Sequence, residues 1–285
     1  MGLEVWKVLR RMTEILGQPM KSILLSVSLL IACSAAAQDW AKAKIESSPR
    51  HHEWVKVKHG DREVNCYVTY PEVNDKATAV IVIHEIYGMT DWARSVTDEL
   101  AAEGDIAIEP DLLSGMAPGG GGTAEMGGQD KATKAVSQLS GEQVTADLDA
   151  VAKYVSALPA CNGKIAVAGF CWGGGQSFQY ATHNKDLKAA FVFYGTPPAD
   201  AADIAKINCP VYGFYGGIDG RVTQSVPKAT EQMKSAGKTY EPVIYEGAGH
   251  GFMRGGEAEA PNARPGDKKA HDDAWTRWKD LLKKI

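Results

Sequence analysis

The sequence is poor in cysteine, with five cysteines in 285 residues, and it contains no closely spaced cysteine pair. Without a C-x-x-C pattern nothing indicates a zinc site of that kind, and so few cysteines in so long a chain exclude a disulfide framework. Cys66 and Cys209 lie in or beside apolar strand-like runs, so we expect them to be inert core residues. Cys161, in the turn "PACNGK", receives no assigned role.

Strong charge of one sign is also missing. The formal net charge is −4, and no basic stretch alternates with aromatic residues, so nothing indicates a nucleic-acid partner. The Gly-rich stretch 114–134 lacks the Gly-Lys-Ser/Thr ending of a phosphate-binding loop. We interpret this stretch as a surface excursion, and a lid over a binding site is the alternative.

The N-terminus has no apolar run of the roughly 20 residues that a transmembrane helix needs. An uncharged apolar run covers only 23–32; Lys21 precedes it, and a small-residue site at Ala35–Ala37 follows. These features are typical of a secretory signal peptide. We therefore expect residues 1–37 to be an export signal and the protein to be periplasmic or extracellular.

Several alternatives for the N-terminus stay open. Acidic residues among the first 19 positions fit an export signal poorly, so Met20 is a candidate for the true start. The stretch "LIAC" resembles the lipobox of bacterial lipoproteins, in which Cys33 would carry a lipid anchor. An apolar helix of the folded domain is the third interpretation. After the signal we expect a linker at 38–53 and a single domain at 54–285.

From residue 54 onward, strand-like and helix-like patterns alternate. The runs 54–58 and 63–70 alternate polar and apolar residues around "HGD" and predict an antiparallel hairpin. The run 78–85 is almost continuously apolar, as in a strand buried on both faces. Further strands are expected at 105–112, 164–170, 189–195, 211–217 and 241–247. Helical patterns separate the strands at 91–103, 141–158, 173–184, 223–236 and 268–283.

This alternation predicts an α/β fold with a mostly parallel eight-stranded sheet and helices on both faces. In the last predicted helix, large apolar residues recur at helical spacing, which indicates core packing and not a cofactor site. These residues are Trp275, Trp278, Leu281 and Leu282. Ligands of such sheets bind outside the carboxyl ends of the strands, so we expect the chemistry there.

The stretch "AVAGFCWGGGQS", residues 166–177, places Cys171 between an apolar run and a cluster of glycines. An apolar run followed by Gly-x-Cys-x-Gly-Gly is typical of a sharp strand-to-helix turn that exposes a nucleophile. The alternative is a buried cysteine that acts as a small hydrophobic residue.

Two other strand ends carry side chains that would complete a catalytic set. Asp219 follows the predicted strand that ends near Tyr215, and His250 follows the one that ends near Tyr245. A histidine can take the thiol proton and later activate water, and a carboxylate can hold the histidine tautomer. The order nucleophile, acid, histidine is that of the α/β-hydrolases. Each residue alone could be structural, but together they favour a triad of Cys171, His250 and Asp219.

Four stretches resemble the dienelactone hydrolases (carboxymethylenebutenolidases) of the α/β-hydrolase superfamily, and the resemblance runs from about residue 54 to the C-terminus. They are "HEIYGM" (84–89), "NGKIAVAGFCWGG" (162–174), "GGIDGRV" (216–222) and "GAGHGFMR" (247–254). The specific signals are the cysteine, where the superfamily usually has serine, and the glutamate of the first stretch. The resemblance implies an α/β-hydrolase fold and hydrolysis of an ester or lactone, dienelactone in the family, with no metal or cofactor.

The resemblance implies the same roles for the triad residues and adds three more residues. Glu85 matches a family glutamate that helps to take the thiol proton when substrate binds. A carboxylate at an apolar strand end can act as a base, and a solvated strand terminus is the alternative. The backbone N–H groups of Ile86 and Trp172 match the family's oxyanion hole.

Substrate recognition by an arginine is also implied by the resemblance. Arg254 matches a family arginine that binds the substrate carboxylate, for which a guanidinium fork is well suited; a solvated surface charge is the alternative. The family's second arginine is missing, because 114–140 contains Lys131 and Lys134 but no arginine. A lysine holds a carboxylate less rigidly, so this departure puts dienelactone itself in doubt as the substrate.

Three functions remain for comparison. We favour an exported, monomeric cysteine hydrolase that cleaves a small, carboxylate-bearing ester or lactone through an acyl-enzyme. The missing arginine favours a general carboxylesterase or thioesterase as the alternative. A non-catalytic binding protein on the same fold is the third, and the complete set of catalytic residues argues against it. Tyr87 and Tyr194 either line the substrate pocket or pack in the core.

Overall fold

The computed structural model describes residues 39–257, 260 and 263–285. The expected export signal, with Met20 and Cys33, lies outside the described residues and stays a prediction. Residues 41–285 form one compact unit, and the account below concerns this unit. Within the described part of the chain, no helix is both long and apolar enough to cross a bilayer.

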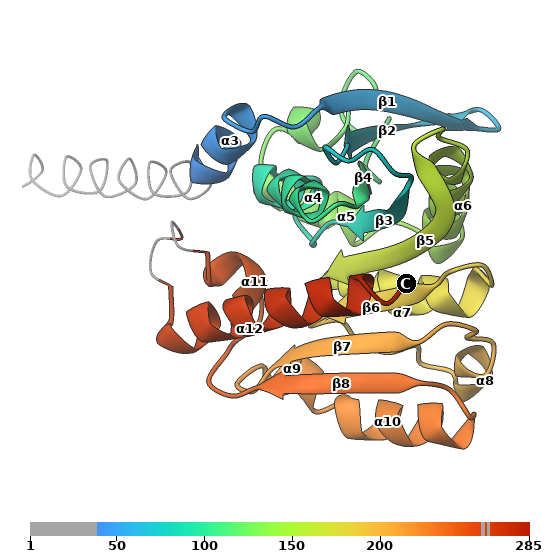
Figure 1. The fold of residues 1–285 in the computed structure, drawn as a ribbon, viewed down its shortest axis with the longest axis vertical. Helices are drawn as coiled ribbons and strands as arrows, with labels where there is room; N and C mark the ends of the chain where they lie inside the picture. The colour runs from blue at the N-terminus through green and yellow to red at the C-terminus, as the bar shows by residue number, and fades with distance from the viewer. Residues whose placement is uncertain (1–38, 258–259, 261–262) are drawn as a thin grey trace, which may run out of the picture. The chain divides into compact units, whose positions relative to one another are not determined.

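Eight strands of the described chain form one sheet in the order β1-β2-β4-β3-β5-β6-β7-β8 (Figure 1). The β1–β2 hairpin and the β2–β4 pair are antiparallel, and all other neighbours are parallel. The predicted hairpin and the predicted mostly parallel eight-stranded α/β fold are confirmed. The strands are β1 (His52–His59), β2 (Arg62–Thr69), β3 (Ala77–Ile83), β4 (Ile106–Pro110), β5 (Cys161–Phe170), β6 (Ala189–Phe193), β7 (Val211–Gly216) and β8 (Tyr240–Tyr245).

The long helices lie at or close to the predicted positions. Two begin at polar caps, because the side chains of Thr90 and Ser140 accept hydrogen bonds from the backbone N–H groups of the first turns. The long helices are α4 (Asp91–Ala102), α6 (Gly141–Ser156), α7 (Trp172–His183), α10 (Val226–Ser235) and α12 (Pro265–Leu282). The shorter ones are α3 (Asp39–Glu46), η1 (Thr123–Met126), α5 (Gln129–Val136), α8 (Ala201–Ile204), α9 (Gly220–Thr223) and α11 (Phe252–Gly255).

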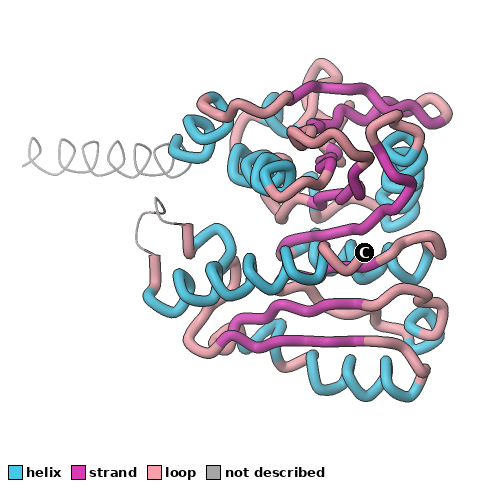
Figure 2. The backbone as a smooth tube through the Cα atoms, in the orientation of Figure 1, coloured by secondary structure: helices cyan, strands magenta, loops and turns pink. Residues whose placement is uncertain are grey.

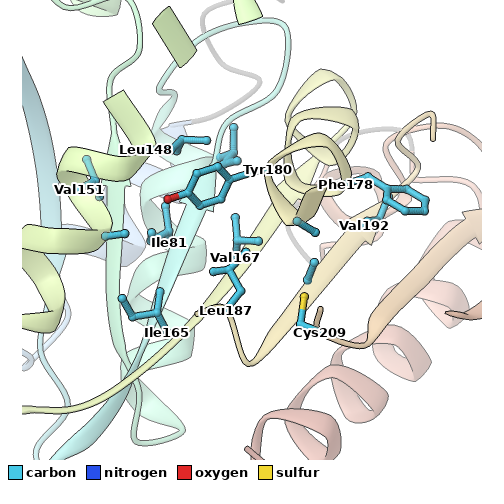
Figure 3. Close-up of a cluster of buried hydrophobic side chains, with 14 of the residues drawn as sticks. Ile81, Leu148, Val151, Ile165, Val167, Phe178, Tyr180, Leu187, Val192 and Cys209 are labelled. Carbon is cyan, nitrogen blue, oxygen red and sulfur yellow. The ribbon is translucent and has the colours of Figure 1, made fainter. Parts of the chain in front are cut away.

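Helices cover both faces of the sheet. Successive side chains of a strand point to opposite faces, so residues of a single strand contact helices on each side. On one face Ile165 and Val167 of β5 pack in a core cluster with residues of α6, α7 and α10; Figure 3 shows its centre. On the other face Phe170 contacts Trp92 of α4 and Trp278 of α12. The four apolar residues assigned to the core face of the last helix are all buried, as predicted.

The Gly-rich excursion after β4 is more ordered than the sequence suggested, since it contains η1 and α5. The carboxylate of Asp111 anchors it by accepting hydrogen bonds from the backbone N–H and the hydroxyl of Thr123. Its apolar residues form a separate small cluster against Ile86 and Trp172. The excursion therefore supports the two residues expected to form the oxyanion hole.

The segment 38–53, expected as a linker, contains α3 and the start of β1. Its charged residues attach it to α4: Lys44 pairs with Glu99, and Arg50 pairs with the buried carboxylate of Asp98. The short, polar sequence has no strong apolar periodicity of its own. Contacts with α4, which lies far along the chain, hold it in place.

Glu109 of β4 is fully buried, and neither of its carboxylate oxygens has a hydrogen-bond partner. Burial raises the pKa of this carboxyl well above its usual range; the nearby charge of Asp111 adds to the shift and Arg94 opposes it. An ionised carboxylate without partners is strongly unfavourable inside a protein, so Glu109 is held in its neutral form.

We expect Glu109→Gln to change how stability depends on pH. In the wild type, raising the pH above about 4.3 deprotonates the unfolded chain first, so folding loses about 1.4 kcal/mol per pH unit until the folded pKa is reached. Glutamine is neutral at every pH and removes this loss. Chemical denaturation at pH 5 and pH 8 should show a stabilisation that grows with pH. Parallel curves for the wild type, the variant and the exposed control Glu231→Gln would contradict the assignment.

Candidate active site

Cys171 lies in the sharp turn between β5 and α7, with backbone angles of φ 56° and ψ −115°. A positive φ is strained for a residue with a side chain and is a feature of nucleophile turns. Two glycines make the turn possible. A Cβ added at Gly169 would lie 1.9 Å from the carbonyl oxygen of Gly173, and one added at Gly173 would lie 2.4 Å from that of His84. The glycines let α7 start directly against β5 and the loop after β3.

His250 and Asp219 lie in the loops that follow β8 and β7, the last two strands in the order of the sheet. In Figure 2, β7 and β8 lie side by side and lead into loops at one edge of the sheet. The Nε2 atom of His250 lies 3.0 Å from the Sγ atom of Cys171, and its Nδ1 atom lies 2.6 Å from Oδ2 of Asp219. Tyr194 packs edge-on against the imidazole at 5.1 Å between ring centroids. The structure thus brings the three predicted residues into one hydrogen-bonded chain.

The environment of the sulfur keeps the thiol neutral at rest. Burial raises the pKa of Cys171, and the negative charge of Glu85 raises it further. Backbone hydrogen bonds from Trp172 and Ile86, and the charge of Arg221, oppose this shift. The same two backbone N–H groups were predicted to form the oxyanion hole, and both point toward the sulfur of Cys171.

Glu85 and Arg254 form an ion pair next to the thiol. The Arg254 Nε donates to Oε2 of Glu85 at 2.8 Å, and the carboxylate is only 3% exposed. The charge of Glu85 raises the pKa of Arg254, and the guanidinium also lies over the ring of Tyr87 at 5.5 Å. Glu85 is therefore a buried, paired carboxylate and not a solvated strand terminus.

A pocket of about 490 Å³ opens at Cys171. Of the predicted residues, Ile86, Trp172 and Tyr194 line it, whereas Tyr87 and Arg254 do not. Sequence analysis did not identify the remaining lining residues, which come from α7, from the loop after β6 and from α9. They are Gly175, Gln176, Gln179, Thr196, Pro197, Pro198, Ala199, Arg221 and Val222.

The three other described cysteines are buried and unpaired, which was expected for Cys66 and Cys209, whereas Cys161 had received no assigned role. They lie at Cys66, Cys161 and Cys209, and their side chains are at most 6% exposed. In the described part of the chain, no group of three or more His, Cys, Asp or Glu side chains is arranged to hold a metal ion.

Comparison with known proteins agrees with this architecture. The family model described as "Dienelactone hydrolase family" matches residues 64–285. A protein of Salmonella typhimurium, provisionally named carboxymethylenebutenolidase, is 34% identical over 243 residues, which cover 75% of this chain and 80% of that protein. A protein of the same provisional name from Saccharolobus solfataricus is 30% identical over 254 residues, which cover 78% of this chain and 95% of that protein.

Solved structures show the same fold. A protein of Klebsiella pneumoniae, provisionally named dienelactone hydrolase, has a TM-score of 0.71 and 27% identity, and the match covers 83% of this chain and 99% of that one. The dienelactone hydrolase-like promiscuous phosphotriesterase P91 from metagenomic libraries has a TM-score of 0.69 at 21% identity, with coverages of 83% and 98%. The chain therefore belongs to the dienelactone hydrolase family and is a hydrolase with the α/β-hydrolase fold.

Proposed function

We propose that the protein cleaves a small ester or lactone through a thioester formed at Cys171. The observation that carries this proposal is the continuous chain from sulfur to carboxylate. The thiol lies 3.0 Å from His250, the imidazole lies 2.6 Å from Asp219, and the sulfur opens onto a pocket. This is the arrangement of nucleophile, base and orienting acid that acyl transfer requires.

In the first half of the reaction, the sulfur attacks the substrate carbonyl carbon, and the thiol proton passes to Nε2 of His250. Backbone N–H groups of Ile86 and Trp172 stabilise the negative charge that develops on the carbonyl oxygen. The C–O bond of the ester then breaks. The leaving alkoxide takes the proton from His250, and the acyl group stays on Cys171 as a thioester.

In the second half, His250 takes a proton from water, and the resulting hydroxide attacks the thioester carbonyl. The C–S bond breaks, the thiolate recovers a proton from His250, and a carboxylic acid leaves. Asp219 holds the proton on Nδ1 throughout and stabilises the imidazolium that forms in both halves.

Glu85 is proposed to help in charging the thiol. The raised pKa of Cys171 implies that a neutral thiol must lose its proton after substrate arrives. In the family that this chain resembles, the matching glutamate takes part in this step. The pairing of Glu85 with Arg254 supports the same role here, because a substrate carboxylate that engaged Arg254 would leave Glu85 free to take the thiol proton transiently and pass it on to Nε2 of His250.

Two substrate classes are proposed, and a different observation favours each. The names of the relatives favour a dienelactone-type lactone as the substrate. The lack of an arginine in 114–140 favours a general carboxylesterase or thioesterase, since the excursion offers only Lys131 and Lys134 to an anion.

A panel of three substrates tests the proposed function and separates the two substrate classes. The purified protein is assayed with p-nitrophenyl acetate, a neutral lactone and a dienelactone, each with and without prior alkylation by iodoacetamide. Dienelactone turnover that alkylation abolishes would support the lactonase, and turnover of neutral esters alone, also blocked, would support the general esterase. Turnover that survives complete alkylation of Cys171 would refute the thioester mechanism.

A further inference from the structure

The pocket at Cys171 carries one positively charged side chain, Arg221, among its lining residues. Arg221 lies in α9, two residues after Asp219. Its guanidinium makes no hydrogen bond or ion pair with any residue that the structure describes, and the residue is exposed. A cation that lines a pocket without a partner is available to an incoming anion.

The charge of Arg221 acts at the reacting centre. It lowers the pKa of the Cys171 thiol, against the stronger opposing effect of burial. Arg254 differs in this respect, because it is already paired with the buried carboxylate of Glu85 and does not line the pocket. A substrate anion in the pocket therefore meets Arg221 first.

The rest of the pocket wall is mixed in character. Gln176, Gln179 and Thr196 offer hydrogen bonds, whereas Trp172 and the two prolines at 197 and 198 offer apolar surface. A volume of about 490 Å³ lies within the range of pockets that enclose small organic ligands. This wall suits a substrate with a short apolar body, the scissile ester at one end and an anionic group at the other.

We propose that Arg221 binds a carboxylate of the substrate and so determines the enzyme's preference for anionic esters. The proposal rests on the proposed esterase function and adds to it. A guanidinium can grip a carboxylate with two parallel hydrogen bonds, and such charge-assisted bonds are stronger than neutral ones. Arg221 would thus supply, from α9, a second carboxylate-binding arginine that the excursion 114–140 lacks.

Kinetics with matched probes test this role. Mono-p-nitrophenyl glutarate carries the carboxylate on the acyl group, and p-nitrophenyl valerate is its neutral counterpart. For the leaving-group side, 4-acetoxybenzoate is compared with its methyl ester. We expect Arg221→Gln to raise KM for one anionic probe about 10- to 100-fold and to leave KM for the neutral probes within about twofold. Loss of the charge near the Cys171 thiol would change kcat alike for anionic and neutral probes, so the comparison rests on KM. The anionic probe that responds shows which side of the ester faces Arg221.

Two further variants exclude simpler explanations. Arg221→Lys keeps the charge but not the planar fork, so we expect it to recover only part of the lost affinity. Lys234→Gln removes the same charge from the exposed surface of α10 and should leave both KM values unchanged. Equal changes of KM for anionic and neutral probes in Arg221→Gln, or no change of KM for either, would overturn the proposal.

Binding to an inactive protein keeps this test separate from the test of function. Calorimetry measures the affinity of two inactive proteins, Cys171→Ala and the double variant Cys171→Ala/Arg221→Gln, for mono-p-nitrophenyl glutarate and 4-acetoxybenzoate. A loss of about tenfold or more for either probe supports the role of Arg221. If the wild type hydrolyses no probe, the proposed function fails. Equal affinities of Cys171→Ala and Cys171→Ala/Arg221→Gln for both probes would overturn the role of Arg221, whatever the outcome for the proposed function.

Discussion

Cys171→Ala will lower kcat for ester hydrolysis by on the order of 10⁴- to 10⁶-fold, because it removes the only sulfur that reaches both His250 and the pocket in the described structure. The loss should fall on kcat, since the pocket and the backbone N–H groups of the proposed oxyanion hole are retained. Steady-state kinetics with p-nitrophenyl acetate and circular dichroism on the same preparation provide the measurement.

The matched control for this variant is Cys209→Ala, which makes the same chemical change at a buried cysteine of the core. We expect a modest loss of stability and nearly full activity. Mass spectrometry after iodoacetamide treatment adds a second reading: among the described cysteines only Cys171 is accessible, and its alkylation should accelerate with pH because its pKa is raised. An active, fully folded Cys171→Ala protein would rule out the thioester.

Asp219→Asn should lower kcat by about 10³- to 10⁴-fold while the protein stays folded. The carboxylate accepts the Nδ1 proton of His250 across 2.6 Å and leaves Nε2 free to take the thiol proton. An amide can instead donate to Nδ1, which places the imidazole proton on Nε2, where it faces the sulfur. The histidine would then be in the wrong tautomer to act as a base.

The chain offers a closely matched control for this substitution. Asp149 also pairs with a histidine, His183, at 2.8 Å, but this pair is exposed on α6 and α7 and does not line the pocket at Cys171. Asp149→Asn should leave kcat within about twofold of the wild type. Equal losses in the two variants would show that the effect of Asp219→Asn is structural, and full activity of Asp219→Asn would remove Asp219 from the mechanism.

Local patterns in the sequence were sufficient to predict most of the fold. Runs such as 78–85 and 164–170 are mostly apolar and rich in β-branched residues, which indicates buried strands. In the helices between them apolar residues recur about every 3.6 residues, so the local sequence identifies each element. The expected positions of the strands were correct to within a few residues. The residues proposed for the triad each follow a strand, and the carboxyl ends of neighbouring parallel strands meet at one edge.

Elements held by distant contacts were harder to predict. The excursion after β4 contains many glycines and few apolar residues, so nothing local indicated η1 and α5; the carboxylate of Asp111 anchors them from outside. Likewise, α3 is attached by the pairing of Lys44 with Glu99, 55 residues away. Glu109 lies in a strand whose sequence gives no sign that the carboxyl has no partner.

The sequence by itself determined the class of the fold, and it was sufficient to propose a cysteine nucleophile and the order of the triad residues, because these depend on periodicity and on short motifs. Only the tertiary structure decided that Glu85 pairs with Arg254, 169 residues away, and that Arg221 lines the pocket while Arg254 does not. The direction of a side chain depends on how its helix or loop packs against strands from elsewhere in the chain. Such packing has no local signal, and so the charges around the thiol became visible only in the folded protein.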